Sequence, residues 1–396
     1  MVMVLQENLS KNVFLNYMLK KYVFFNIFIV YVKKWCNIIH EEMIIVRLLS
    51  FNEYDLKTSK ILEALNDASR SLAELKGFAN SISNQHILIN AITINEAKDS
   101  SAIENIVTTH DSIYKVLTES GFKEDAAKEV VNYRGAIWYG YEMVKDKGFI
   151  STNMLVKIQS MIEPNKVGIR KTLGTNLVNS VTGEIIYTPP QTEGEIRDLL
   201  KNLEDYINDF DDDIDPLIKM ALIHYQFESI HPFYDGNGRT GRILNVLYLV
   251  LNNLLDSPIL YLSNYINKNK SDYYRLFTEF RENINYEDWI IYILKGIEET
   301  SKNTIELIKR IQEEMESYKN EFMMKLPKIY SDELLDALFF EVYTRINYIE
   351  DRCEVTRQTA STYLNQLVES GLLECEKVGR ESIYKNIRLI NLLSKF

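Results

Sequence analysis

The chain has 396 residues, of which 46% are hydrophobic and 26% are charged. These proportions are ordinary for a soluble globular protein, and the length allows two or three domains with cores of their own. The formal net charge of −11 argues against sequence-independent binding to nucleic acid, which requires a basic surface. Three scattered cysteines (Cys36, Cys353 and Cys375) form neither a disulfide framework nor a metal knuckle, which favours a reducing, cytoplasmic location.

Residues 1–50 are an N-terminal extension of uncertain role. Lysine pairs enclose a largely apolar stretch, residues 22–32, which is shorter than the roughly 20 residues that cross a bilayer. No small-residue cleavage site follows, so neither a membrane span nor a signal peptide is expected. A peripheral helix, or upstream sequence ahead of an alternative start at Met43, is favoured over a weak interfacial anchor.

Apolar residues recur at helical spacings of three and four from about residue 55 onward. Helices are therefore expected over residues 56–75, 92–108 and 123–147. Gly77 is expected to stop the first of them. Between residues 168 and 190 the pattern changes to that of two short strands around a glycine-bearing turn, and two prolines end the hairpin.

The next segment begins with a strong helix start. Asp215 can cap the helix, and Pro216 suits its first position. This helix is expected to deliver His231 at its end. A new helix near Arg239 is apolar on nearly all sides, which indicates the buried centre of its domain.

Residues 231–242 read His-Pro-Phe-Tyr-Asp-Gly-Asn-Gly-Arg-Thr-Gly-Arg. A glycine-rich turn at the start of a helix presents free N–H groups that bind phosphate. Gly236, Gly238 and Gly241 let the backbone approach a ligand without a Cβ in the way. The segment therefore predicts an anion-binding loop.

The charged and titratable groups of this loop indicate its chemistry. Asp235 is its only carboxylate and suits Mg²⁺, which takes few protein ligands plus phosphate oxygens. Arg239 and Arg242 can bind the remaining phosphates through forked donors. A histidine with an ordinary pKa of about 6.5 suits His231 to accept a proton from a hydroxyl. We predict a nucleotide-handling transferase.

Rival motifs fail on spacing. A Walker P-loop is absent, an EF-hand would place Arg239 and Val246 at ligand positions, and the zinc-protease pattern is incomplete. His224, two turns before the loop, is expected to be a satisfied core histidine.

The twelve residues resemble the Fic-family signature, His-x-Phe-x-(Asp/Glu)-Gly-Asn-Gly-Arg-x-x-Arg, at every defined position. The likeness extends from about residue 56 to residue 300. It implies a mainly α fold, a helical Fic core with a β-hairpin flap. Family members mostly move AMP from ATP to a Ser, Thr or Tyr hydroxyl of a protein. ATP, Mg²⁺ and a protein target are therefore implied, and a homodimer is compatible with this reading.

The resemblance implies roles for single residues. His231 resembles the base that deprotonates the target hydroxyl, Asp235 the magnesium ligand and Arg242 the γ-phosphate clamp. The resemblance implies that Gly236, Asn237, Gly238 and Arg239 form the cradle for the α- and β-phosphates. It also implies that Gly241 contributes to nucleotide binding.

Two further groups are candidates beside the nucleotide and the target. The hairpin residues Tyr187, Thr188 and Pro189 resemble the family's flap, which aligns a target segment by strand-like pairing; a surface hairpin with only local packing is the alternative. Tyr273 and Tyr274 either stack near the nucleobase or are core aromatics.

Ser100 and Glu104, in Ser-Ser-Ala-Ile-Glu-Asn, resemble the inhibitory motif of one family class, (Ser/Thr)-x-x-x-Glu-(Gly/Asn). Alone, this spacing is common on solvated helix faces. The resemblance implies that Glu104 pairs with Arg242, which would keep the γ-phosphate away and leave ATP in an unreactive pose.

Residues 326–396 are expected to form a small α+β unit. A helix over residues 334–349, a second over about 355–368 and a hairpin over 371–385 resemble a winged helix-turn-helix. The outward residues of its recognition helix are Arg357, Gln358, Ser361 and Thr362. Such modules usually bind DNA, but nine Lys and Arg against eleven Asp and Glu give a net charge of −2. DNA binding and a structural or protein-binding role are therefore equally favoured.

The expected organisation follows from these segments. It comprises an extension (1–50), a helical region with the inhibitory helix (51–120), a catalytic core (121–305), a linker helix (306–325) and the winged unit (326–396). The leading hypothesis is an autoinhibited protein AMP transferase. Two alternatives remain: transfer of another nucleotide or phosphoryl group, and a nucleotide-sensing DNA-binding regulator.

Overall fold

The computed structural model describes residues 54–395, except 81–84, 119–123, 179–182, 184, 284, 341 and 379–380. The expectations for residues 1–50 lie outside the described residues. The described chain is mainly α, with two small antiparallel sheets. This confirms the predicted fold class of a helical core with small β elements. No described helix is both long enough and apolar enough to cross a membrane.

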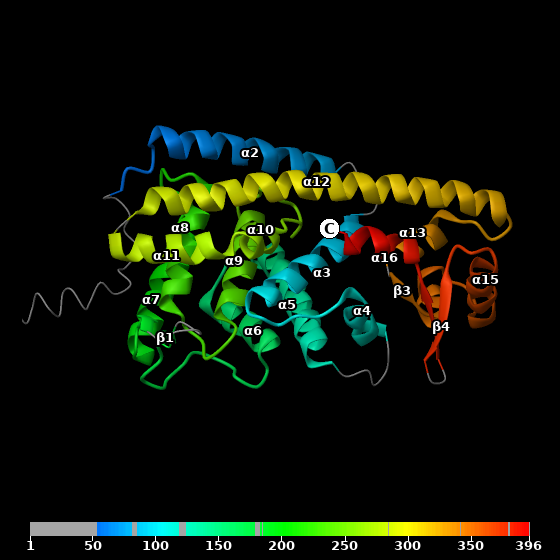
Figure 1. Cartoon of the computed structure of the whole chain (residues 1–396), viewed down its shortest axis with the longest axis horizontal. Helices are drawn as coiled ribbons and strands as arrows, with labels where there is room; N and C mark the ends of the chain where they lie inside the picture. Colours follow the sequence, from blue (N-terminus) through cyan, green and yellow to red (C-terminus); the bar gives the residue numbers. More distant parts are fainter. Residues whose placement is uncertain are drawn as a thin grey trace, which may run out of the picture. The chain divides into compact units, whose positions relative to one another are not determined.

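Two long helices, α2 (Ser59–Asn80) and α12 (Tyr286–Lys325), lie side by side (Figure 1). The expectation that Gly77 ends the first helix is wrong, because α2 continues three residues beyond it. A glycine inside a helix costs only about 1 kcal/mol relative to alanine, and burial of Ala79 favours continuation. The expected linker over residues 306–325 is the second half of the 40-residue α12.

Four helices are described between α2 and the hairpin. They are α3 (Gln85–Ile103), α4 (His110–Thr118), α5 (Asp125–Lys147) and α6 (Thr152–Ile162). The helix expected over residues 92–108 therefore starts earlier and stops five residues sooner. Asn105 has a left-handed backbone (φ 63°), a conformation that asparagine tolerates better than most residues, and it turns the chain toward α4.

The hairpin consists of β1 (Leu177–Val178) and β2 (Ile185–Tyr187), which are shorter than expected. The chain continues into α7 (Glu193–Ile207), whose N-terminus is capped by the Thr192 hydroxyl accepting from the N–H of Glu195. The two strands pair antiparallel. The central glycine-bearing turn is only partly described.

Two buried helices form the centre of the domain, α8 (Pro216–Ile230) and α9 (Asn237–Leu251). The Asp215 carboxylate caps α8 by accepting from the N–H of Leu217, as predicted. In α12, the Trp289 indole donates to the carbonyl of Ala221 in α8 over 2.9 Å. The helices α10 (Leu262–Lys268) and α11 (Lys270–Asn283) complete this part.

The C-terminal domain begins after α12. It contains α13 (Asp332–Phe340), β3 (Tyr343–Thr344), α14 (Ile346–Arg352), α15 (Arg357–Glu369), β4 (Glu374–Val378), β5 (Glu381–Lys385) and α16 (Ile387–Ser394). The strand order is β3-β5-β4. The single helix expected over residues 334–349 is wrong: Tyr343 and Thr344, both strand-favouring residues, pair with β5.

Candidate functional site

His231 lies at the C-terminal end of α8 in a left-handed conformation (φ 47°). Its N–H donates to the carbonyl of Phe227 over 3.1 Å, and its own carbonyl accepts from Arg170 Nε over 2.8 Å. A non-glycine residue with positive φ is uncommon and persists only when its surroundings hold it. These backbone contacts therefore fix the place from which the imidazole projects.

The His231 imidazole is partly exposed at this helix junction. Burial lowers its pKa to about 4, and the charge of Arg170 adds to the effect, whereas Glu104 opposes it. The ring is therefore neutral near pH 7. Its buried Nδ1 has no hydrogen-bond partner among the described residues. A neutral imidazole at this position is able to accept a proton.

A tight loop joins His231 to α9. Gly236 caps the helix with φ 77°, a conformation that favours glycine. The Asn237 carboxamide accepts from the N–H of Phe233 over 2.8 Å and donates to the Phe233 carbonyl over 2.9 Å. Asn237 therefore fixes the loop with its side chain, so its contribution to an anion site would come from its backbone N–H.

Two glycines of α9 lie against carboxylates. A Cβ on Gly238 would collide with the carboxylate of Glu104, and one on Gly241 with the carboxylate of Glu228. The missing side chains therefore give these acids room beside the helix. Burial raises the pKa of Glu228 to about 8, although the Arg242 charge lowers it.

Arg242 is buried and bound to the end of α3. Its Nε donates to Ser100 Oγ over 2.7 Å, and its Nη2 donates to the Ser100 carbonyl over 2.9 Å. The same Nη2 lies 3.0 Å from Glu104 Oε1. The structure thus brings together the three residues that the resemblance associates with inhibition.

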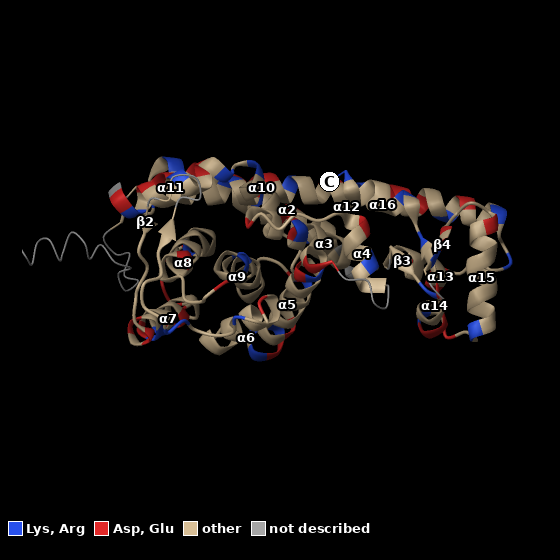
Figure 2. Ribbon diagram, turned by 60° about the horizontal axis from the view of Figure 1, so that its bottom comes forward, with Lys and Arg blue, Asp and Glu red and all other residues tan. Residues whose placement is uncertain are grey.

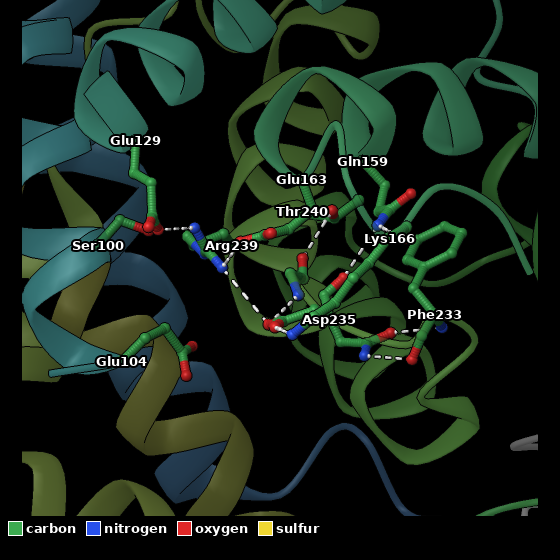
Figure 3. A network of polar contacts seen from close by, with 12 residues as sticks. Ser100, Glu104, Glu129, Gln159, Glu163, Lys166, Phe233, Asp235, Arg239 and Thr240 are labelled. Carbon is green, nitrogen blue, oxygen red and sulfur yellow. Dashed lines mark hydrogen bonds and ion pairs between the residues drawn. The ribbon is translucent and has the colours of Figure 1, made fainter. Parts of the chain in front are cut away.

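Arg239 has carboxylate partners that the sequence did not indicate. Its guanidinium is 2% exposed and lies 3.0 Å from Glu129 Oε2 and 2.5 Å from Glu163 Oε1. Asp235 Oδ1 is 3.5 Å away. Figure 3 shows Glu129 and Asp235 approaching Arg239 from different sides. Arg239 therefore joins α5, α6 and the loop, and its contact with phosphate stays a prediction.

Asp235 presents a partly exposed carboxylate at the loop. Partial burial raises its pKa, but hydrogen bonds from Lys166 and the N–H of Gly236 hold that pKa below its ordinary value. Lys166 Nζ lies 2.5 Å from Asp235 Oδ2, and the buried Gln159 donates to the Asp235 carbonyl over 3.1 Å (Figure 3). Asp235 is therefore an ionised carboxylate, the ligand type that Mg²⁺ prefers, and it already binds a cationic group, the Lys166 ammonium. No group of three or more metal-ligating side chains occurs in the described part, so phosphate or water would complete the coordination.

Arg170 is a structural residue that the sequence analysis missed. It is 1% exposed, and besides the His231 carbonyl it binds the carbonyls of Pro190 and, at 3.4 Å, Ile230. Its backbone N–H donates to the Pro232 carbonyl over 2.9 Å. It therefore ties the end of the hairpin to the motif loop. A lone arginine after Gly168 carries no signal for this role.

The hairpin is anchored beside α8 through Tyr187. The Tyr187 hydroxyl donates to the Ser229 carbonyl over 2.7 Å, and the Arg281 guanidinium lies 4.6 Å above its ring. Thr188 donates to Asn176 across the hairpin over 2.8 Å, and the Pro189 carbonyl accepts from Gln191. This places the predicted flap next to His231, and its role toward a target stays a prediction.

The two candidate tyrosines have different environments. Tyr273 is 5% exposed, hydrogen-bonded to His224 over 3.0 Å and packed beside Trp289. Its position is that of a core aromatic rather than of a stacking surface. Tyr274 is 48% exposed and remains the candidate for a nucleobase contact. The expectation that His224 is a core histidine is confirmed, because it is fully buried and its Nε2 is hydrogen-bonded to Tyr273. It is satisfied at that nitrogen alone, since Nδ1 has no hydrogen-bond partner among the described residues.

On α15, Arg357, Gln358 and Thr362 are exposed, whereas Ser361 is partly buried. The helix carries a basic residue only at its start and an acidic one at its end (Figure 2). The adjoining β4–β5 hairpin exposes glutamates on both strands. Among the described residues of α15 and this hairpin, acidic side chains therefore offset the positive charge on which most DNA contacts rest.

Three segments match families of known proteins. Residues 62–142 match the Fic/DOC family N-terminal region, and residues 149–249 match the Fic/DOC family. Residues 315–389 match the C-terminal domain of SoFic-like protein adenylyltransferases. The second match contains the motif loop, and the first contains Glu104.

Curated relatives are similar over short segments. Protein adenylyltransferase fic-1 of Caenorhabditis elegans is 42% identical over 59 residues, which are 15% of this chain and 11% of that protein. A probable protein adenylyltransferase of Aquifex aeolicus is 56% identical over 43 residues, 11% of this chain and 13% of that protein. The matches thus span about an eighth or less of these relatives.

A solved structure shares the fold. The crystal structure of a Fic family protein from Desulfovibrio desulfuricans covers 82% of this chain and 95% of its own, with a TM-score of 0.50 and 19% sequence identity.

Proposed function

Because the chain belongs to the Fic/DOC family, we propose that it is a protein adenylyltransferase that moves AMP from ATP to a hydroxyl of a protein. Ser, Thr and Tyr side chains are the acceptors, including those of the enzyme itself. The observation that carries the proposal is the placement of His231, at the end of α8, beside the glycine-rich N-terminus of α9. A general base and an anion site in one loop are the two requirements of nucleotidyl transfer.

The residues of the loop divide the reaction between them. The free N–H groups at the start of α9 bind the phosphates, and the helix dipole favours their negative charge. His231 takes the proton of the acceptor hydroxyl, whose oxygen attacks the α-phosphorus. The bond from that phosphorus to the bridging oxygen breaks, and pyrophosphate leaves. Mg²⁺ held by Asp235 would neutralise charge on the phosphates. Electrostatic stabilisation of this kind is usually the largest contribution to such a rate.

The Glu104–Arg242 pair supports autoinhibition as part of the proposal. Arg242 is the guanidinium that would hold the γ-phosphate, and in the structure Glu104 and Ser100 occupy its donors. A γ-phosphate close to Glu104 would also meet a like charge. ATP would then bind with its α-phosphorus out of line with the incoming hydroxyl.

Mass spectrometry of the Glu104→Gly protein after incubation with ATP and Mg²⁺ tests the reaction and its base together. We expect a mass gain of one adenylyl unit that is lost when His231→Ala is added. ATP labelled separately at the α- and γ-phosphates distinguishes AMP transfer from phosphoryl transfer. A gain of label from the γ-phosphate alone, or AMP transfer that survives His231→Ala, would contradict the proposal.

The proposal includes a cytoplasmic location, a homodimer and a winged helix in the C-terminal domain. The exposed Arg357, Gln358 and Thr362 on α15 support DNA contact, whereas the exposed glutamates of the neighbouring hairpin oppose it. Fluorescence anisotropy with labelled duplex DNA at two salt concentrations tests whether this domain binds DNA. Binding that weakens with salt and with Arg357→Ala would support a DNA role.

A further inference from the structure

We propose that the C-terminal domain positions Glu104, with Asn90, Asp111 and Tyr343 as the positioning residues. The inference rests on the proposed function, because it concerns the control of the same site. The C-terminal domain, residues 326–395, would then regulate the catalytic part of the same chain, whether or not it also binds a partner.

Glu104 lies in the connection between two helices, α3 and α4, here called the α3–α4 hairpin. Backbone hydrogen bonds from Glu104 to Ser101 and from Asn105 to Ala102, both 3.0 Å, shape this connection. His110 Nε2, at the start of α4, lies 2.7 Å from Asn95 Oδ1 on α3, and both residues are buried. The two helices are thus tied together close to Glu104, so a shift of either helix is transmitted to it.

The C-terminal domain binds the first arm of the hairpin at Asn90. This residue is 3% exposed, and its Nδ2 donates to the carbonyl of Phe340 over 2.7 Å. Phe340 is the last residue of α13, so its carbonyl has no partner within the helix. Asn90, in the first half of α3, therefore caps a helix of the C-terminal domain.

The second arm is held at Asp111. The Tyr343 hydroxyl of β3 donates to Asp111 Oδ1 over 2.5 Å. Lys385 of β5 lies 3.6 Å from the same oxygen, and its ammonium is 4.7 Å above the Tyr343 ring. The rings of Tyr114 and Tyr343 also pack at a centroid distance of 5.0 Å. A hydrogen bond to a carboxylate is stronger than one between neutral groups, and the Lys385 ammonium beside it keeps Asp111 ionised.

The catalytic part binds the same hairpin between these two points. Glu96 Oε2 accepts from the N–H of Ser263 over 3.0 Å, and Asp99 accepts from Asn264 over 2.8 Å. Glu104 therefore sits between anchors to the catalytic part, at Glu96 and Asp99, and an anchor to the C-terminal domain, at Asp111. Loss of the C-terminal anchors would leave α4 free to shift and Glu104 less well held against Arg242.

A double-mutant cycle tests this coupling. Tyr343→Phe removes one hydroxyl and keeps the ring, and Tyr363→Phe on α15 is the matched control in the same domain. Each change is made in the full-length chain with Glu104 and with Glu104→Gly. Calorimetry measures the affinities for ATP and ADP in the presence of Mg²⁺, because the pair occupies the donors of the γ-phosphate. Hydrogen exchange of residues 95–108 reports the hairpin itself.

We expect Tyr343→Phe to tighten ATP binding by about 5- to 10-fold, which is the lower end of the usual coupling between two sites. ADP affinity should stay unchanged, and exchange in residues 95–108 should rise. In the Glu104→Gly background the same substitution should have no further effect on ATP affinity. Asp111→Asn, which weakens the same contact from the other side, should repeat the result.

Other outcomes overturn the inference. Equal effects in both backgrounds, or weaker binding of ATP and ADP alike, would mean that Tyr343 serves stability alone. Unchanged exchange and affinity in both Tyr343→Phe and Asp111→Asn would mean that the contact does not reach Glu104. If the Glu104→Gly protein gains no AMP, the proposed function fails, but nucleotide affinity and exchange still decide the coupling. A poorly folded Tyr343→Phe protein leaves the decision to Asp111→Asn.

Discussion

Glu104 and Arg242 are separated by 138 residues of sequence, yet their side chains meet at 3.0 Å beside Gly238. The absence of a Cβ at Gly238 makes this approach feasible, because a methyl group there would collide with the carboxylate. Gly238 therefore leaves room for the Glu104–Arg242 contact and, in the proposed reaction, for the close approach of a phosphate. Substitution of Gly238 would consequently disturb both states, and Glu104 is the more informative position to change.

Glu104→Gln separates the charge of this residue from its size. The amide can still hydrogen-bond Arg242, but charged hydrogen bonds are roughly twice as strong as neutral ones. The initial rate of self-labelling with α-labelled ATP should be about tenfold above that of the unmodified protein. It should remain below the rate of Glu104→Gly. Glu74→Gln, an exposed change on α2, is the control. A rate equal to that of the unmodified protein would show that charge is not what restrains the site.

The pH dependence follows from the lowered pKa of His231. Only the neutral imidazole accepts a proton, and a pKa of about 4 keeps it neutral at every pH above about 5. An unperturbed histidine would instead lose activity below its ordinary pKa of about 6.5. Removal of Glu104, whose charge raises the pKa, should lower it further. The labelling rate of Glu104→Gly should thus be flat between about pH 6 and 8.

Single-turnover labelling across this range checks the profile, with circular dichroism at each pH as the control for folding. A half-loss of rate near pH 6.5 in a folded protein would show that the imidazole is solvated in the reacting state. That result would contradict the lowered pKa of His231, on which the expected flat pH profile depends.

The sequence predicts those features that depend on local chemistry. The cap at Asp215, the arrival of His231 at a helix end and the identity of the loop all follow from neighbouring residues. The Glu104–Arg242 contact came from a resemblance, because a Ser-x-x-x-Glu spacing has no physical specificity by itself. The structure adds the Ser100 contacts that complete it.

Long-range contacts explain what the sequence did not predict. Glu129 of α5 and Glu163, the C-cap residue of α6, reach Arg239 from 110 and 76 residues away, and no periodicity links them. Packing overrides a local signal at Gly77, through which α2 continues toward the buried Ala79. Tyr343 and Thr344 instead follow their own strand preference, which the helical pattern over residues 334–349 had hidden, and they pair with β5.

Arg170→Met should destabilise the protein. The substitution keeps an apolar stem of similar length but leaves the carbonyls of His231 and Pro190 without their donor. An unsatisfied buried polar group costs about 1–3 kcal/mol, so a loss of at least about 2 kcal/mol in the free energy of unfolding is expected. Urea denaturation measures it, and Arg70→Met, a change at an exposed arginine, is the control. Equal midpoints for the two variants would mean that water replaces the guanidinium.

Asp235→Asn tests the magnesium site by titration of the metal rather than by activity at one concentration. The amide is a poorer ligand for a hard cation than a carboxylate. The Mg²⁺ concentration that gives half of the maximal increase in ATP affinity should therefore rise on the order of tenfold. Lys166→Met should act in the opposite direction, because it removes the ammonium that lies 2.5 Å from the same carboxylate. Asp198→Asn on the exposed face of α7 controls for surface charge. If both Asp235→Asn and Lys166→Met left the magnesium requirement unchanged, the metal would have to bind through the nucleotide alone, and Asp235 would serve only to hold Lys166 and the loop.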